Sequence, residues 1–138
     1  MRHNPPPQHP ASAGKLLLDT HTLLWLMQDA AQLSSAARRL LQAAENVHVS
    51  SVPLWEVAIK RSLGKLKLDP GVLDAQLAAS AVQPLPLTWA HAQRLHALPP
   101  HHGDPFDRML VAQALCEPLH LLTHDAALAV YADLIITV

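Results

Sequence analysis

The sequence predicts an α/β protein: a three-layer α/β/α domain around a mostly parallel sheet of about five strands. Short apolar runs alternate along the chain with longer segments of helical periodicity, the order expected when crossover helices connect parallel strands. The chain has 138 residues, and two domains of about 70 residues each would have poor hydrophobic cores. A single domain is therefore expected.

Five short segments are predicted as strands. The segment 15–18 (KLLL) is a short apolar run, and 47–50 (VHVS) alternates apolar and polar residues. The segment 82–87 (VQPLPL) is expected at an edge of the sheet, because proline cannot donate a hydrogen bond to a neighbouring strand. The last two strands are predicted at 120–123 (HLLT) and 134–138 (LIITV).

Seven helices are predicted around these strands, several of them marked by residues that typically begin or end a helix. Ser34, Asp69 and Thr88 are candidate N-caps, Pro70 suits the first helical position, and Gly64 is a plausible stop. The predicted helices cover 20–28, 35–44, 51–63, 70–80, 89–98, 104–116 and 125–131.

Composition limits both the extent of the domain and its class. Residues 1–14 contain four of the twelve prolines and are predicted to be a disordered tail, which leaves 15–138 as the folded domain. The single cysteine, Cys116, excludes a disulfide framework and fits a cytoplasmic protein. No apolar run reaches the about 18 residues of a membrane span. The net charge of -1 argues against coating nucleic acid by charge alone.

Acidic residues follow the strands or begin the helices in four separate segments. Asp19 follows the first predicted strand, and Glu56 lies about one turn into the helix after the second. Asp104 and Asp107 begin the helix predicted at 104–116, and Asp125 follows the fourth strand. Carboxyl ends of parallel strands and the N-termini of the following helices meet at one edge of a sheet. The topology therefore predicts that these carboxylates converge.

Capping is the simpler alternative for most of these acids taken singly. Asp104 followed by a proline is a good helix start, and Asp19 and Asp125 could cap helices too. Glu56 could pair with Lys60 four residues later, for only about 0.2–0.5 kcal/mol.

Convergence favours a cation site instead. Two carboxylates about 4 Å apart repel each other by about 4 kcal/mol at an effective dielectric constant of 20, so a cluster needs raised pKa values or a cation. Oxygen ligands without a cysteine or an H-E-x-x-H motif suit Mg²⁺ or Mn²⁺, and such ions suit phosphoryl chemistry.

Four segments together resemble PIN-domain ribonucleases, specifically the VapC-like toxins of type II toxin–antitoxin pairs. They read LLLDTHTLLWL, SSVPLWEVAIKRSLGKLKL, LPPHHGDPFDRMLVAQA and LLTHDAAL, and the resemblance covers about residues 15–137. It implies a parallel α/β/α fold and a metal-dependent endoribonuclease that uses Mg²⁺ or Mn²⁺ to hydrolyse RNA. It also implies a homodimer and a cognate antitoxin protein as partner.

The resemblance assigns roles to individual residues. The catalytic acids that it implies are Asp19, Glu56, Asp107 and Asp125. Asp104 is an extra acid of the DPFDR variant, and the metal would be held by Asp19, Asp107 and one or both of Asp104 and Asp125. Glu56 would orient or deprotonate the attacking water, and Thr123 is a hydroxyl partner for the acids.

Basic residues are the candidates for contacts with RNA. Four of the ten Lys and Arg residues fall within eight positions, and with Arg108 they form the predicted RNA-binding set: Lys60, Arg61, Lys65, Lys67 and Arg108. The alternative is a solvated helix end whose positive charge is favoured by the helix dipole. Arg108 could contact phosphate or hold the acid-bearing loop.

Aromatic and histidine residues give weaker indications. Aromatic residues are few, so recognition of bases by stacking is poorly supported. Trp25, Trp55 and Phe106 are expected in the core or at an interface. The loop pair His101-His102 could bind transition metals, and other histidines flank acid positions, but their spacing matches no defined histidine site.

Three other functions were weighed against the nuclease. A haloacid-dehalogenase-like phosphatase needs Asp-x-Asp after the first strand, where this chain has His21 in the third position. A receiver domain needs an acid pair there and a lysine after the last strand, and neither is present. The serious rival is a catalytically weak binding module with the same fold, acting through its dimer or its antitoxin. Loss of an acid would favour this rival, but the expected acids are all present.

Overall fold

A five-stranded sheet forms the centre of the protein. The computed structural model describes residues 14–138, and the strands lie in the order β3-β2-β1-β4-β5. Every pair of neighbouring strands is parallel, as predicted. The strands are β1 (Lys15–Leu18), β2 (Asn46–Ser50), β3 (Gln83–Leu85), β4 (His120–Thr123) and β5 (Ile135–Thr137).

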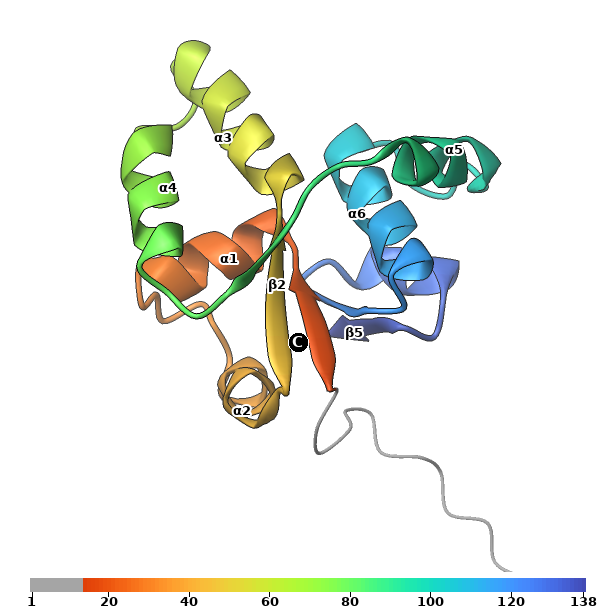
Figure 1. Ribbon diagram of the computed structural model, residues 1–138, viewed down its shortest axis with the longest axis horizontal. Helices are drawn as coiled ribbons and strands as arrows, with labels where there is room; N and C mark the ends of the chain where they lie inside the picture. Colours follow the sequence, from red (N-terminus) through yellow and green to blue (C-terminus); the bar gives the residue numbers. More distant parts are fainter. Residues whose placement is uncertain (1–13) are drawn as a thin grey trace, which may run out of the picture.

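Helices connect the strands and cover both faces of the sheet (Figure 1). They are α1 (Thr20–Met27), α2 (Ser35–Ala43), α3 (Ser51–Ser62), α4 (Pro70–Ala78), α5 (Trp89–Ala97), α6 (Pro105–Cys116) and a 3-10 helix, η1 (Ala126–Tyr131). The predicted caps Ser34, Asp69 and Thr88 each accept a hydrogen bond from the first turn of their helix. Gly64 has a φ of 72° just beyond α3, the left-handed conformation that glycine adopts readily at a helix end.

Two predicted elements differ in the structure. The edge strand expected at 82–87 shortens to β3, which ends before Pro86, a residue with no N–H to donate to a neighbouring strand. The last predicted helix, 125–131, is the 3-10 helix η1, and Asp125 stands before it as its N-cap.

The central strands are buried on both faces, which creates the three layers. Leu17 of β1 packs in a core cluster with residues of α6, whereas Leu16 and Leu18 pack in a second cluster with residues of α1 and α2. These leucines are fully buried. Such double burial explains why the segment of β1 reads as a continuous apolar run.

The strand order reverses beside β1. Strands β2 and β3 extend the sheet on one side of β1, and β4 and β5 extend it on the other. In open α/β sheets, ligands bind at the carboxyl ends of the strands next to such a reversal. The backbone N–H of Asp19, directly after β1, donates to the carbonyl of Leu122 in β4 at 3.2 Å. The fold thus places the first predicted acid where β1 and β4 diverge.

The ends of the domain bear on two sequence expectations. The predicted tail, 1–14, lies outside the described residues except for Gly14, whose carbonyl accepts hydrogen bonds from the backbone N–H groups of Glu45 and Asn46. Within the described range, none of the helices has both the length and the apolar character needed to cross a bilayer.

Candidate active site

Asp19 is buried at the junction of β1 and α1. Its Oδ1 accepts the backbone N–H of Thr22 at 2.8 Å, which makes Asp19 the N-cap of α1. Its Oδ2 accepts the hydroxyl of Thr123, at the end of β4, at 2.6 Å. Only 2% of Asp19 is exposed. The carboxylate is therefore held by the start of α1 and by the end of β4, and Thr123, which the resemblance named as a hydroxyl partner for the acids, is one of its donors.

Glu56 approaches from α3 and is also buried, with 4% of the residue exposed. Its Oε1 accepts the hydroxyl of Thr20 at 2.7 Å. Its Oε2 accepts a hydrogen bond from Lys60 Nζ at 2.5 Å, the i,i+4 pair expected from the sequence. The sequence analysis did not identify Thr20 as a partner of Glu56. Its position directly after Asp19 was the only signal for such a role.

Asp104 and Asp107 enter from the start of α6. Asp104 is its N-cap, and its Oδ1 accepts the backbone N–H groups of Phe106 at 2.8 Å and Asp107 at 3.1 Å. Burial and then the negative charges of Asp104, Asp19 and Glu56 raise the pKa of Asp107 from 3.8 to about 7, against a lowering effect of His102. Carboxylates from three separate segments therefore act on Asp107, which is the convergence that the topology predicted.

Asp125 lies beside a histidine rather than deep in this cluster. Its Oδ2 is 2.9 Å from His102 Nε2, and its Oδ1 accepts the backbone N–H of Ala127 at 3.0 Å. The hydrogen bond from His102 is the main cause that lowers the pKa of Asp125. Its backbone N–H donates to the hydroxyl of Thr123 at 3.0 Å, so one threonine serves both Asp19 and Asp125.

His102 joins two of the acid-bearing segments, a role that its sequence did not indicate. Its Nδ1 accepts the backbone N–H of Asp104 at 3.1 Å, so the ring proton belongs on Nε2, facing Asp125. One ligand atom from each of His102, Asp107 and Asp125 lies within 4.8 Å of the other two, close enough to share a metal ion. The sequence suggested that the loop pair His101-His102 could bind a transition metal, and the structure places His102 in such a group of residues.

The predicted basic set divides into groups with different surroundings. Lys60 is bound to Glu56, and Arg61 donates to the carbonyl of Lys67 just beyond α3. Lys65 and Lys67 are exposed in the segment that follows α3. The C-terminal end of α3, from which this segment continues, points away from the sheet (Figure 1). Arg108 donates to the carbonyl of Leu98 at 3.2 Å, and its Nε is buried without a partner among the described residues. This contact matches the loop-holding alternative for Arg108.

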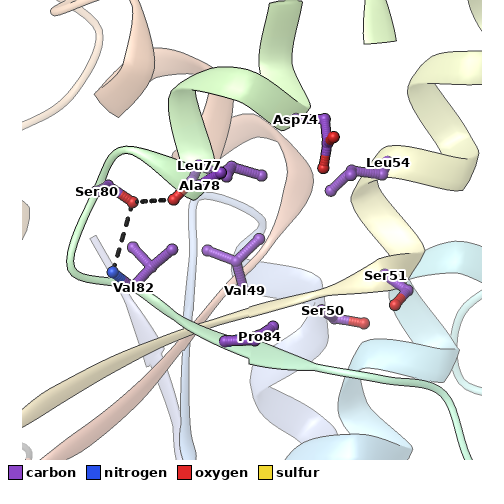
Figure 2. Close-up of a pocket in the computed structure, with 10 residues that line it drawn as sticks. All are labelled: Val49, Ser50, Ser51, Leu54, Asp74, Leu77, Ala78, Ser80, Val82 and Pro84. Atoms are coloured by element: carbon purple, nitrogen blue, oxygen red, sulfur yellow. Dashed lines mark hydrogen bonds between the residues drawn. The ribbon is translucent and has the colours of Figure 1, made fainter. Parts of the chain in front are cut away.

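A separate hollow of about 460 Å³ lies between β2, β3, α3 and α4 (Figure 2). Apolar side chains such as Leu54 and Leu77 line it, and Asp74 is its acidic residue. At its rim, Ser80 donates to the carbonyl of Leu77 and accepts the backbone N–H of Val82. None of the acids around Asp107 lines this hollow, so it is distinct from the carboxylate site.

Comparisons with known proteins agree with this architecture. The family model of the PIN domain matches residues 16–134. The chain is 30% identical to Ribonuclease VapC22 of Mycobacterium tuberculosis over 115 residues, which are 82% of this chain and 88% of that protein.

Solved structures show the same fold at low sequence identity. VapBC2 from Rickettsia felis, solved bound to a promoter DNA fragment, matches with a TM-score of 0.64 at 14% identity, over 90% of this chain and 97% of that chain. A toxin–antitoxin complex from Klebsiella pneumoniae matches with a TM-score of 0.61 at 19% identity, over 88% and 96% of the respective chains. The family match, the curated relative and the carboxylate site together show that this chain belongs to the PIN domain family and is a relative of the VapC ribonucleases.

Proposed function

We propose that the protein is a metal-dependent endoribonuclease that acts as the toxin of a toxin–antitoxin pair. The observation that carries this proposal is the meeting of carboxylates from the β1–α1 junction, α3 and α6 around Asp107, whose pKa is raised to about 7 by burial and then by these charges. The 30% identity to a VapC ribonuclease supports RNA as the substrate.

The donor atoms of the site fit a hard divalent cation, Mg²⁺ or Mn²⁺. Carboxylate oxygens are the preferred ligands of both ions, and a cation would relieve the repulsion that raises the pKa of Asp107. Asp19 and Asp107 would hold the ion, together with one or both of Asp104 and Asp125. A bound cation supplies stabilisation of the negative charge that develops on a phosphodiester during hydrolysis.

The protein's own residues would position the attacking water. Glu56 is held by Thr20 on one carboxylate oxygen and by Lys60 on the other. This fixed carboxylate would orient the water or accept its proton. Thr123 keeps Asp19 in place through its 2.6 Å hydrogen bond.

An antitoxin and a second copy of the chain are the proposed protein partners. The structural neighbours include VapBC2 from Rickettsia felis and a toxin–antitoxin complex from Klebsiella pneumoniae, which supports an antitoxin for this chain. The helices around 20–27 and 51–63 are the candidate surface for it. The cytoplasmic location and the homodimer remain predictions.

RNA cleavage by the purified protein tests the nuclease. Cleavage is expected with Mg²⁺ or Mn²⁺ and is expected to stop in EDTA or in Asp19→Asn, which can still cap α1. Asp19→Ala and Glu56→Ala are expected to be inactive but folded. Full activity of both alanine variants would overturn the site. Intact RNA in all conditions, from folded protein free of antitoxin, would favour the catalytically weak binding module.

A further inference from the structure

Two aromatic rings bridge α3 and α6 beside the acids. Trp55 directly precedes Glu56, and Phe106 directly precedes Asp107. The two rings meet edge to face, with centroids 5.0 Å apart and planes at 76°. Helices α3 and α6 therefore interact in two ways. The charge of Glu56 acts on Asp107, and the ring of Trp55 contacts the ring of Phe106. The aromatic pair lies at the edge of the candidate active site.

Trp55 is unusually open for an aromatic residue in a packed contact. It is 53% exposed, whereas the Phe106 ring is partly buried against the core cluster that includes residues of α6. Because Trp55 is 53% exposed, about half of the residue stays open to solvent in spite of its contact with Phe106. The start of α6 is also held by the bond from the Phe106 N–H to Asp104. Trp55 is thus supported by Phe106 and remains accessible from solvent.

Charge explains why such a ring would be useful here. The site contains four carboxylates, those of Asp19, Glu56, Asp104 and Asp107. Their negative charge repels an RNA backbone even when one divalent cation is bound. Of the nearby cations, Lys60 is already paired with Glu56. Contact with an uncharged nucleobase gives binding energy that does not depend on the phosphate charge. Such contact requires an unpaired base, because paired bases are already stacked within a helix.

We propose that Trp55, supported by Phe106, is a stacking platform for a nucleobase of single-stranded RNA next to the cleaved phosphodiester. This inference rests on the proposed ribonuclease function and names a substrate-positioning residue for it. The platform accepts any base, since every base has a π-face, and it selects unpaired over paired RNA. It is an alternative to the interface role that the sequence suggested for Trp55, whose 53% exposure argues against the core role.

The test compares two substitutions of Trp55 with a matched control. Trp55→Leu removes the aromatic face, Trp55→Phe keeps one, and Trp89→Leu changes a tryptophan that is 93% exposed on α5. Binding is measured in an Asp19→Asn background with two RNA oligomers of equal length, one unstructured and one abasic at all central positions. This background keeps RNA intact, so binding can be measured whether or not the wild type cleaves.

Trp55→Leu is expected to weaken binding of the base-containing oligomer by about ten-fold, the effect of losing one stacked base. Binding of the abasic oligomer is expected to stay unchanged, and Trp55→Phe is expected to keep most of the affinity. In the cleaving enzyme the same change should raise KM far more than it lowers kcat. If the wild type does not cleave RNA but Trp55→Leu still weakens binding of the base-containing oligomer alone, the proposed ribonuclease function is wrong and the stacking role of Trp55 is supported.

Three results would overturn the platform. One is an equal loss for both oligomers, and another is a loss in Trp89→Leu as large as in Trp55→Leu. The third is unchanged RNA binding in Trp55→Leu accompanied by a lost dimer or lost antitoxin binding, which would assign the exposed indole to a protein interface instead.

Discussion

Helices α4 and α6 begin with the same Asp-Pro pair in nearly the same backbone conformation. Asp69 has φ and ψ of -79° and 123°, and Asp104 has -78° and 116°. Each carboxylate accepts a hydrogen bond from a backbone N–H in the first turn of its helix. Local chemistry alone would give both residues the same role.

The third helical position and the place in the fold separate the two helix starts. That position holds exposed Val72 in α4 but Asp107 in α6, where burial and then the charges of Asp104, Asp19 and Glu56 raise the pKa of Asp107. Asp104 therefore caps its helix and also belongs to an electrostatic cluster, whereas Asp69 only caps. Capping and function are not alternatives for an aspartate, because one carboxylate can do both.

The largest expected contrast between the two helices is in catalysis. Asp107→Asn should lower RNA cleavage by at least about a hundred-fold, because it removes a charged ligand of the proposed cation and part of the field around the reacting phosphate. Asp69→Asn should leave the rate unchanged. Initial rates with saturating Mn²⁺ on one RNA substrate measure both. Equal rates in the two variants would place the chemistry away from α6.

Cation binding should show the next largest effect, through the loop that precedes α6. His102→Ala removes the partner of Asp125 and the acceptor of the Asp104 N–H. A loss of about ten- to a hundred-fold in Mn²⁺ affinity is expected, as for residues that orient metal ligands. The control is His101→Ala, which removes a neighbouring exposed ring that contacts Tyr131 at a tilted angle. Titration calorimetry measures both, and identical affinities would confine His102 to holding the loop.

These contrasts show how far the sequence alone reaches. The order of elements along the chain, the helix starts and the convergence of Asp19, Glu56 and Asp107 follow from periodicity and topology, because both are set by regular elements. The contacts of Thr20 and His102 do not, since they depend on where a side chain points within a turn or a loop. His102 meets Asp125 across 23 positions of the chain, a distance over which no local pattern gives a signal.

The pH dependence of stability should separate Asp107 from ordinary acids. Its pKa is about 7 in the metal-free fold and 3.8 in its ordinary state. The native state therefore holds a proton that the unfolded state has lost, and this group makes the protein less stable as pH rises from about 4 to 7. In EDTA, Asp107→Asn should match the wild type near pH 4 and unfold at a higher temperature at pH 8. Parallel curves across this range would mean that neither burial nor the neighbouring carboxylates raise the pKa of Asp107.

The smallest expected effect is in the two caps themselves, and here the sign matters more than the size. Asp69→Ala should cost about 1 kcal/mol, a fall of about 3 °C in Tm, because α4 loses its cap. Asp104→Ala loses an equivalent cap but also removes a negative charge beside Asp107. At pH 8 in EDTA its loss of Tm should therefore be smaller than that of Asp69→Ala, and Asp104→Asn, which can still cap, should raise Tm.

Adding Mn²⁺ should reverse this ranking, because the bound cation turns the charge of Asp104 from a repulsive into a stabilising one. A ranking that Mn²⁺ leaves unchanged would show that Asp104, like Asp69, acts only on its helix.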